Sequence, residues 1–422
     1  MTIYYLLLIC ERFHDYPHLN SQLFNAGFIP VTITKLMGVV AVAMAMIMPR
    51  PTGWAKPARD AMMPLFAAFA LWPLLGTLAL GLPLPAVSFS YLISLALLMV
   101  ATRSLICTPE RARNVIRASV LAAGMGAAWC YKQHFMEGAE RAWGVGLDPN
   151  YEALSMVMMI PLAAWMGRAE VRLLWRTVGA LTAASLAGAT YLTQSRGGLL
   201  ALAVVGFAAL LRTRRRPATL CALLVAFGAL LTLAPVGLWQ RFENIRLSGS
   251  PINGDETAAQ TRLELIVAGL SMVESHPLLG VGLDGFKAAA PSYDPRLRES
   301  GTQYIAHNTY LQVAAETGLP GLFLFVALMA VCFGNCRAVE RCARDPALAA
   351  FAAAIRLALL AYAVAGLFLT AEFVVWYWLL IFLSGNLRES AAAGFSFESF
   401  ETPAMAVPRA QAAAGPRAIG YA

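Results

Sequence analysis

Charged side chains are scarce in this sequence. Asp, Glu, Lys and Arg make up only 13% of its 422 residues, whereas hydrophobic residues make up 59%. Soluble domains carry about 25% charged residues, so this composition excludes an ordinary water-soluble domain. The long polar stretch 237–317 contains none of the seven cysteines, which excludes a disulfide-stapled domain there. C-x-x-C, H-E-x-x-H and D-x-D patterns are also missing, and with them the familiar metal-binding signatures.

The residues that are present form long apolar runs rich in Leu, Ala, Val and Gly. About 18 to 20 such residues cross a bilayer core as a helix, and in lipid only helices or closed barrels satisfy their own backbone. The runs do not alternate with period two, so helices are favoured. We expect an all-α polytopic protein of about 11–12 spans. Eleven lie near 28–48, 62–80, 84–101, 114–131, 151–167, 173–192, 198–211, 218–236, 318–336, 350–369 and 373–387.

The basic residues are distributed by topology. Every second connection between spans is rich in Lys and Arg, and such short loops face the cytoplasm. This pattern, and not a nucleic-acid partner, accounts for the net charge of +8. It places the large loop 237–317 on the outer side of the membrane and the C-terminus in the cytoplasm, in a multi-pass protein surrounded by membrane lipids. The basic connections contain Arg50, Lys56 and Arg59; Arg103, Arg111 and Arg113; Arg168 and Arg172; Arg212, Arg214, Arg215 and Arg216; and Arg337, Arg341 and Arg344.

The chain divides into four parts on this basis. N-terminal transmembrane helices occupy 1–236, with Met1–Cys10 as a partial first span, and C-terminal transmembrane helices occupy 318–387. The loop 237–317 between them contains an amphipathic helix at about 257–275, where apolar residues recur at helical spacing up to Ser275-His276-Pro277. Residues 388–422 are rich in Ala, Pro and Gly, and we expect a disordered cytoplasmic tail.

Arg196 is the first candidate for chemistry. It stands in Thr193-Gln194-Ser195-Arg196-Gly197-Gly198, a short turn predicted to be periplasmic, where positive charge is disfavoured. One interpretation is an arginine that reaches out to lipid phosphate. The other, which we favour, is an anion clamp beside glycines that allow a substrate to approach the backbone.

His307 and Arg262 are the next candidates. The chain has only five histidines, and His307 lies where the outer loop meets the membrane. An imidazole titrates near neutral pH and can accept a proton from a hydroxyl group, although an interfacial histidine can also be structural. Arg262 lies near the start of the loop helix.

Charge is absent from the middle of the confident spans, since Arg356 and Glu372 lie near span ends. Transporters and channels bury ionisable residues at mid-membrane and are often built from repeats. The sequence has neither feature, so a site at the outer interface is favoured over a lipid or polysaccharide transporter.

Three ordered pieces of sequence resemble the O-antigen ligase superfamily, which includes Wzy-type polymerases and bacterial O-oligosaccharyltransferases. They are Ser195-Arg196-Gly197-Gly198, then Thr261-Arg262 with Ser275-His276-Pro277-Leu278-Leu279-Gly280-Val281-Gly282, then His307-Asn308-Thr309-Tyr310-Leu311 with Glu316-Thr317-Gly318-Leu319-Pro320-Gly321. The resemblance implies a bacterial inner-membrane glycosyltransferase that transfers a glycan from undecaprenyl diphosphate to a hydroxyl group.

The resemblance also implies roles for individual residues. Arg196 and Arg262 would hold the donor diphosphate, and His307 would be the essential histidine. Without a D-x-D pair, the transfer would need no metal or other cofactor and would invert the anomeric carbon. The favoured acceptor is lipid A core, as in an O-antigen ligase; a growing polysaccharide or a protein hydroxyl are the alternatives.

Five further residues are supporting candidates. Ser195 and Asn308 adjoin the main ones in the sequence. Glu316 is expected to orient His307 or the arginines. Asp148 and Asn150 lie at the outer end of another span and either bind the acceptor or form a helix cap through Asn150, with the cap slightly favoured.

Overall fold

The computed structural model describes residues 24–26, 29–31, 33–47, 61–145, 148–212, 254–300 and 304–394. Helices dominate this part of the chain, and a small antiparallel pair of strands precedes the first of them. In chain order the elements are β1 (Phe24–Ala26), β2 (Ile29–Val31), α2 (Ile33–Ile47), α3 (Met62–Ala79), α4 (Ala86–Leu105), α5 (Pro109–Phe135), α6 (Pro149–Ala169), α7 (Leu173–Leu192), α8 (Arg196–Arg212), α11 (Gly254–Ser275), α12 (Phe286–Tyr293), α13 (Pro295–Ser300), α14 (Thr309–Cys342), α15 (Pro346–Ala365) and α16 (Val375–Ala392).

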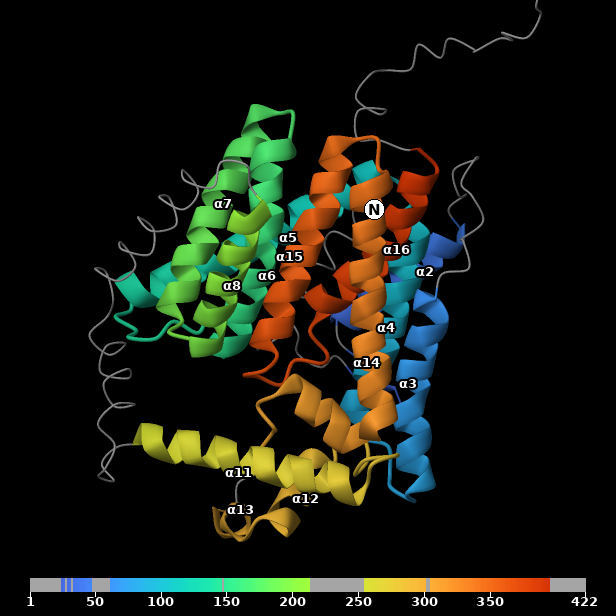
Figure 1. Ribbon diagram of the computed structural model, residues 1–422, viewed down its shortest axis with the longest axis vertical. Coiled ribbons are helices and arrows are strands. Elements are labelled where there is room, and N and C mark those ends of the chain that lie inside the picture. The colour runs from blue at the N-terminus through green and yellow to red at the C-terminus, as the bar shows by residue number, and fades with distance from the viewer. Residues whose placement is uncertain are drawn as a thin grey trace, which may run out of the picture.

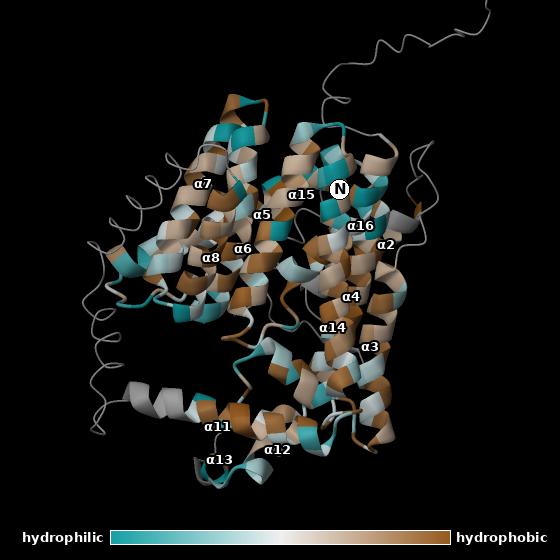
Figure 2. Ribbon diagram, viewed as in Figure 1, coloured by the Kyte–Doolittle hydropathy of each residue, from teal (hydrophilic) through white to brown (hydrophobic). Residues whose placement is uncertain are grey.

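The expected all-α membrane fold is confirmed. Ten of the eleven predicted spans coincide with described helices. Four of these, α3, α4, α14 and α15, are long and apolar enough to cross a membrane by length and composition alone. Apolar residues cover the middle of the bundle helices, and polar residues gather toward their ends (Figure 2). The total number of spans stays a prediction.

The amphipathic helix expected at 257–275 is α11, which begins at Gly254 and ends at Ser275 as the following His-Pro pair predicted. Together with α12 and α13 it crosses one end of the helical bundle (Figure 1). One face of α11 is buried in a small separate core that contains Leu265, Ala268 and Met272. The other face exposes apolar side chains such as Leu263, 62% exposed, so the helix is apolar on two sides.

Helix α14 differs from the predicted boundary at residue 318. Helical structure begins at Thr309, within the segment assigned to the loop, and the helix is broken at Gly318, where φ is 71° and ψ is −179°. The residues before the break pack in the loop core through Leu311 and Ala315, whereas those after it pack in the bundle core through Phe325. The predicted entry into the bundle is therefore a sharp bend inside one helix.

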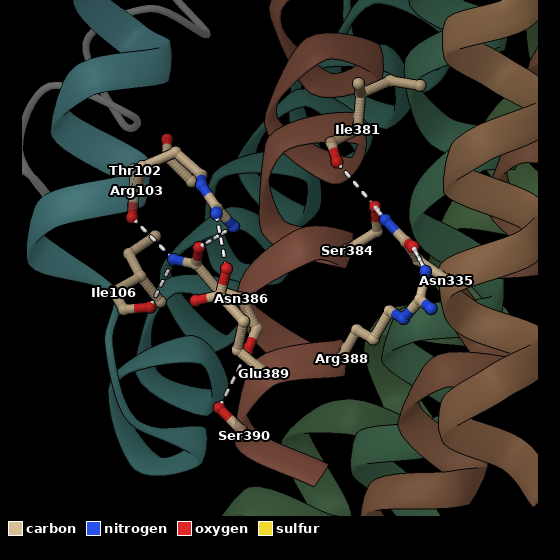
Figure 3. A network of polar contacts seen from close by, with 10 residues as sticks. All are labelled: Thr102, Arg103, Ile106, Asn335, Ile381, Ser384, Asn386, Arg388, Glu389 and Ser390. Atoms are coloured by element: carbon tan, nitrogen blue, oxygen red, sulfur yellow. Dashed lines mark hydrogen bonds and ion pairs between the residues drawn. The ribbon is translucent and has the colours of Figure 1, made fainter. Parts of the chain in front are cut away.

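At the carboxyl end of α16 a polar network joins three helices (Figure 3). The Arg103 guanidinium on α4 donates to Asn386 Oδ1 at 2.5 Å and to Glu389 Oε1 at 2.6 Å. Arg388 donates to Asn335 Oδ1 on α14 at 3.0 Å. Charge-assisted hydrogen bonds are stronger than neutral ones, so the buried Arg103–Glu389 pair fastens α16 to α4, and the exposed Arg388 adds a bond from α16 to α14.

Several expectations lie outside the described residues. These are the partial span at Met1–Cys10, the span at 218–236, the loop residues 237–253 and the tail from residue 395 onward. The first residues assigned to the tail are helical, because α16 continues past Leu387 to Ala392.

Candidate functional site

The amino end of α6 lies against the turn between α7 and α8. Asp148 caps α6, since its Oδ1 accepts from the backbone amides of Asn150 at 2.7 Å and Tyr151 at 3.2 Å. The expectation that Asn150 forms this cap was therefore wrong, because the capping residue is Asp148. Asn150 Oδ1 instead accepts from Ser195 Oγ at 2.9 Å and from the Arg141 guanidinium at 3.2 Å. The amide of Asn150 thus joins two segments far apart in the sequence.

Ser195 sets the start of α8. Its Oγ accepts from the backbone amide of Gly198 at 3.3 Å, the pattern of an N-cap. Arg196 is the first residue of α8 and is exposed. The two hydrogen bonds of the Ser195 hydroxyl therefore fix where the Arg196 backbone lies relative to α6.

The two glycines after Arg196 serve packing. A Cβ on Gly197 would lie 2.8 Å from the Phe368 Cβ, and one on Gly198 would lie 2.6 Å from the Ala153 Cβ. Both glycines are buried by protein. The expectation that they expose backbone to a substrate was wrong, because Phe368 of the connection after α15 and Ala153 of α6 fill that space.

His307 lies directly before α14 and is half-buried. Burial lowers the pKa of His307, the nearby charge of Arg262 lowers it further, and the carboxylate of Asp148 acts in the opposite direction. The imidazole is accordingly held neutral at neutral pH, the form that accepts a proton. The electrostatic influence of both residues also shows that α11 and the start of α6 come near His307.

Left-handed backbone is concentrated in this region. Among the described residues, three that are not glycine have positive φ: Gln194 at 50°, Asp284 at 57° and His307 at 50°. Such conformations cost about 1–3 kcal/mol each and tend to cluster at functional sites. Here they occur beside Ser195, beside the partners of Glu316, and at the candidate histidine itself.

Asn308 caps α14 directly after His307. Its Oδ1 accepts from the backbone amides of Tyr310 and Leu311, each at 3.0 Å. The side chain that the sequence placed among the supporting candidates therefore has a definite structural role, which is to set the angle at which the chain leaves His307 and enters α14.

Glu316 organises the loop through hydrogen bonds to residues other than His307. Its carboxylate accepts from the backbone amides of Asp284 at 3.1 Å and Phe286 at 3.3 Å, and from the Gln312 amide. Gln312 Oε1 in turn accepts from the Ala306 amide at 2.8 Å. Glu316 therefore affects His307 through Gln312 and the residue that precedes the histidine.

Two of the sequence pieces form one backbone interlock. The Val281 amide donates to the Ala315 carbonyl at 2.8 Å, and the Leu319 amide donates to the Pro277 carbonyl at 2.8 Å. These bonds cross the break in α14, where the regular helical pattern is interrupted. The turn at 276–285 thus satisfies backbone groups that the break leaves open.

Glycine is required on both sides of the interlock. A Cβ on Gly318 would lie 2.2 Å from the Leu278 carbonyl oxygen, and one on Gly280 would lie 2.4 Å from the Glu316 carbonyl carbon. Both glycines have positive φ, 71° and 65°. Close backbone approach accounts for their place in the sequence pieces.

Sequence reasoning missed the connection 366–374 between α15 and α16. Thr309 Oγ1 donates to the Leu369 carbonyl at 2.7 Å, and the Tyr151 hydroxyl donates to the Thr370 carbonyl. This connection therefore contacts the amino ends of both α14 and α6. It lies at the centre of the candidate site.

Two polar atoms of this connection, Thr370 Oγ1 and Glu372 Oε2, are buried without a hydrogen-bond partner. Burial raises the pKa of Glu372 to about 7. The signal in the sequence was that Glu372 is the only charged residue between Arg356 and Arg388. An ionisable residue isolated in an apolar stretch is a functional candidate by default.

The predicted residues therefore gather at one end of the bundle. Hydrogen bonds join the segments of Asp148, Asn150 and Ser195, and electrostatics join Asp148 and Arg262 to His307. Arg262 is exposed on α11. Within the described ranges, no group of three or more His, Cys, Asp or Glu side chains is arranged to hold a metal ion.

Residues 180–326 match a family model described as O-Antigen ligase. The match supports the O-antigen ligase superfamily. It extends from α7 to α14 and includes Ser195, Arg196, Arg262, His307 and Glu316, whereas Asp148, Asn150 and the connection 366–374 lie outside it. No curated protein matches the chain.

A match to an O-antigen ligase model in a chain of apolar helices suggests a glycan-transferring membrane enzyme. The matched family implies, in general terms, a lipid-linked glycan and an acceptor as substrates. Both arginines and the histidine singled out from the sequence fall inside the matched segment.

Proposed function

We propose that this protein transfers a glycan from undecaprenyl diphosphate to a hydroxyl acceptor at the periplasmic face of the bacterial inner membrane. The favoured acceptor is lipid A core, as in O-antigen ligation. The observation that carries the proposal is the half-buried His307, whose pKa is lowered by burial and by the charge of Arg262, at the same end of the bundle as the start of α8. The Lys and Arg pattern of the connections supports the periplasmic side and a cytoplasmic C-terminus.

The chemistry divides between the two kinds of residue. The acceptor oxygen attacks the anomeric carbon while its proton passes to the ring nitrogen of His307. The bond from that carbon to the diphosphate oxygen breaks, and the diphosphate leaves with the electron pair. Arg196 and Arg262 balance the negative charge that develops on the leaving group. A single displacement inverts the anomeric carbon, and solvent then removes the proton from His307.

The supporting residues have positioning roles in this scheme. Asp148 moderates the pKa of His307, Asn150 and Ser195 fix the start of α8, and Asn308 sets the start of α14. Glu316 holds the loop and, through Gln312, the residue before His307.

The test is transfer by purified protein in lipid nanodiscs. Labelled undecaprenyl-diphosphate glycan is offered with lipid A core, with free polysaccharide and with a peptide hydroxyl acceptor. Wild-type protein is expected to label lipid A core, and His307→Ala to lose at least a thousandfold in rate at unchanged thermal stability. His276→Ala is the matched control, because His276 is an exposed histidine of the same loop.

Each result decides something different. Transfer to polysaccharide or peptide replaces the acceptor and keeps the chemistry. Full activity of a folded His307→Ala variant would show that His307 is not the base that accepts the proton of the acceptor hydroxyl. Absence of transfer to all three acceptors by the wild-type protein refutes the proposed function.

A further inference from the structure

The connection between α5 and α6 is ordered by side-chain hydrogen bonds. Its buried anchor is Gln133, whose Nε2 donates to the Gly144 carbonyl at 3.0 Å. Gln133 Oε1 accepts from the amides of Trp143 at 3.1 Å and Gly144 at 2.9 Å. These three bonds use three of the four hydrogen-bonding positions of one buried amide and fix the backbone at Trp143 and Gly144 against α5.

The connection between α5 and α6 forms hydrogen bonds with the turn between α7 and α8. Arg141 Nε donates to the Thr193 carbonyl at 2.9 Å, and the Ala142 amide donates to the Leu192 carbonyl at 3.0 Å. Those carbonyls belong to the last turn of α7, where helical partners run out. Gln194, strained at a φ of 50°, donates from Nε2 to the loop as well. The loop thus replaces the missing helical bonds and holds the strained turn.

Arg141 is also linked to the start of α8 through Asn150 on α6. Its guanidinium donates to Asn150 Oδ1, the same oxygen that accepts from Ser195 Oγ. The chain of contacts runs from Arg141 through Asn150 to Ser195, whose hydroxyl caps the helix that begins at Arg196. One guanidinium therefore binds the turn that presents Arg196 directly at Thr193 and, through Asn150 on α6, indirectly at Ser195.

We propose that Arg141 is a positioning residue for glycan transfer, which fixes the turn 193–195 and thereby aims Arg196 at the donor diphosphate. The inference rests on the proposed function. Arg141 lies outside the segment that matches the O-antigen ligase model, so the family match does not assign it a role. A neutral side chain of similar length would lose both bonds and leave the Thr193 carbonyl and Asn150 oxygen with one donor fewer.

A double-mutant cycle tests this role, because residues that act through one another are non-additive. Arg141→Met is expected to lower kcat/KM for the lipid-linked donor about tenfold and to leave the acceptor KM unchanged. In an Arg196→Ala background the same change should cost less than twofold, since the residue that Arg141 positions is gone. Arg141→Lys, which can reach one of the two acceptors, should recover part of the loss.

Arg356→Met is the matched control. Arg356 also joins two segments through its guanidinium, which forms an ion pair with Glu340 at 2.8 Å between α15 and α14, and any loss that its replacement causes should be equal in both backgrounds. Equal losses for Arg141→Met in both backgrounds, or a raised acceptor KM, would overturn the positioning role. If Arg141→Met does not fold, Arg141→Lys carries the same cycle with a smaller expected coupling.

The two proposals fail in distinguishable ways. No transfer by the wild-type protein refutes the proposed function. In that case the rise in Tm on binding of the lipid-linked donor still tests the inference. This rise should be smaller for Arg141→Met than for the wild-type protein. In the Arg196→Ala background, Arg141→Met should reduce it no further. An additive loss of stabilisation overturns it.

Discussion

Replacing Gly318 by alanine should break the interlock between the turn 276–285 and α14. The residue adopts a φ of 71° with a ψ of −179°, a region that is almost exclusive to glycine and costs other residues about 1–3 kcal/mol. The added Cβ would also meet the Leu278 carbonyl oxygen at 2.2 Å, so the two backbones must separate. Three backbone hydrogen bonds cross this contact, each contributing about 0.5–1.5 kcal/mol.

The expected loss of stability is therefore roughly 3 to 7 kcal/mol, the sum of the strain and the three bonds. With an unfolding entropy of about 2 cal/mol/K per residue, this corresponds to a fall of roughly 3 to 8 °C in Tm. Thermal unfolding of the detergent-solubilised protein, followed by tryptophan fluorescence, measures it.

Gly334→Ala is the control in the same helix. A Cβ there meets nothing within 4 Å, and alanine is favoured over glycine in a helix by about 0.5–1 kcal/mol. The Tm of this variant should be equal to or slightly above that of the wild-type protein. An unchanged Tm for Gly318→Ala, or an equal fall for both variants, would refute the role assigned to the interlock.

Three further predictions concern pH and metal. Asp148→Asn keeps a good helix cap but removes the carboxylate that raises the pKa of His307. The imidazole then stays neutral to lower pH, so the acid limb of the profile of kcat/KM against pH should move to lower pH. An acid limb that does not move would contradict the electrostatic effect of Asp148 on His307. The pKa of Glu372, raised by burial from 4.5 to about 7, means that the folded chain holds a proton that the unfolded chain releases, so stability should fall as pH rises from 4.5 to 7. Glu372→Gln should remove that fall, and parallel Tm curves for variant and wild-type would contradict it. Chelation by EDTA should leave transfer unchanged, and loss of transfer that is restored by a divalent cation would show the metal-independent mechanism to be wrong.

Local features of the fold followed from the sequence because their causes are local. The apolar runs specify helices wherever the structure describes them, since lipid leaves the backbone few alternatives. The loop helix was predicted to end near Ser275, and α11 does end there, because the proline at 277 disfavours helix in the residue before it. Arg196, Arg262 and His307 stood out because charge and imidazole are rare in such a chain.

Contacts between distant segments were beyond sequence reasoning. Asn150 was expected to cap its own helix but contacts Arg141 and Ser195 instead. Nothing in the sequence around Thr309 indicates that its hydroxyl bonds the Leu369 carbonyl, 60 residues away. Such pairings depend on how helices pack, and one sequence does not specify which helix ends meet.

The sequence by itself determined the class of protein, most of the helices and the candidate residues for the proposed chemistry, because composition and periodicity act within a few turns of chain. Tertiary structure alone decided that the glycines after Arg196 serve packing, that Gly280 and Gly318 lock a loop to a broken helix, and that the connection 366–374 lies at the centre of the site. The physical reason is that close approach and hydrogen bonding between distant backbones exist only once the chain has folded.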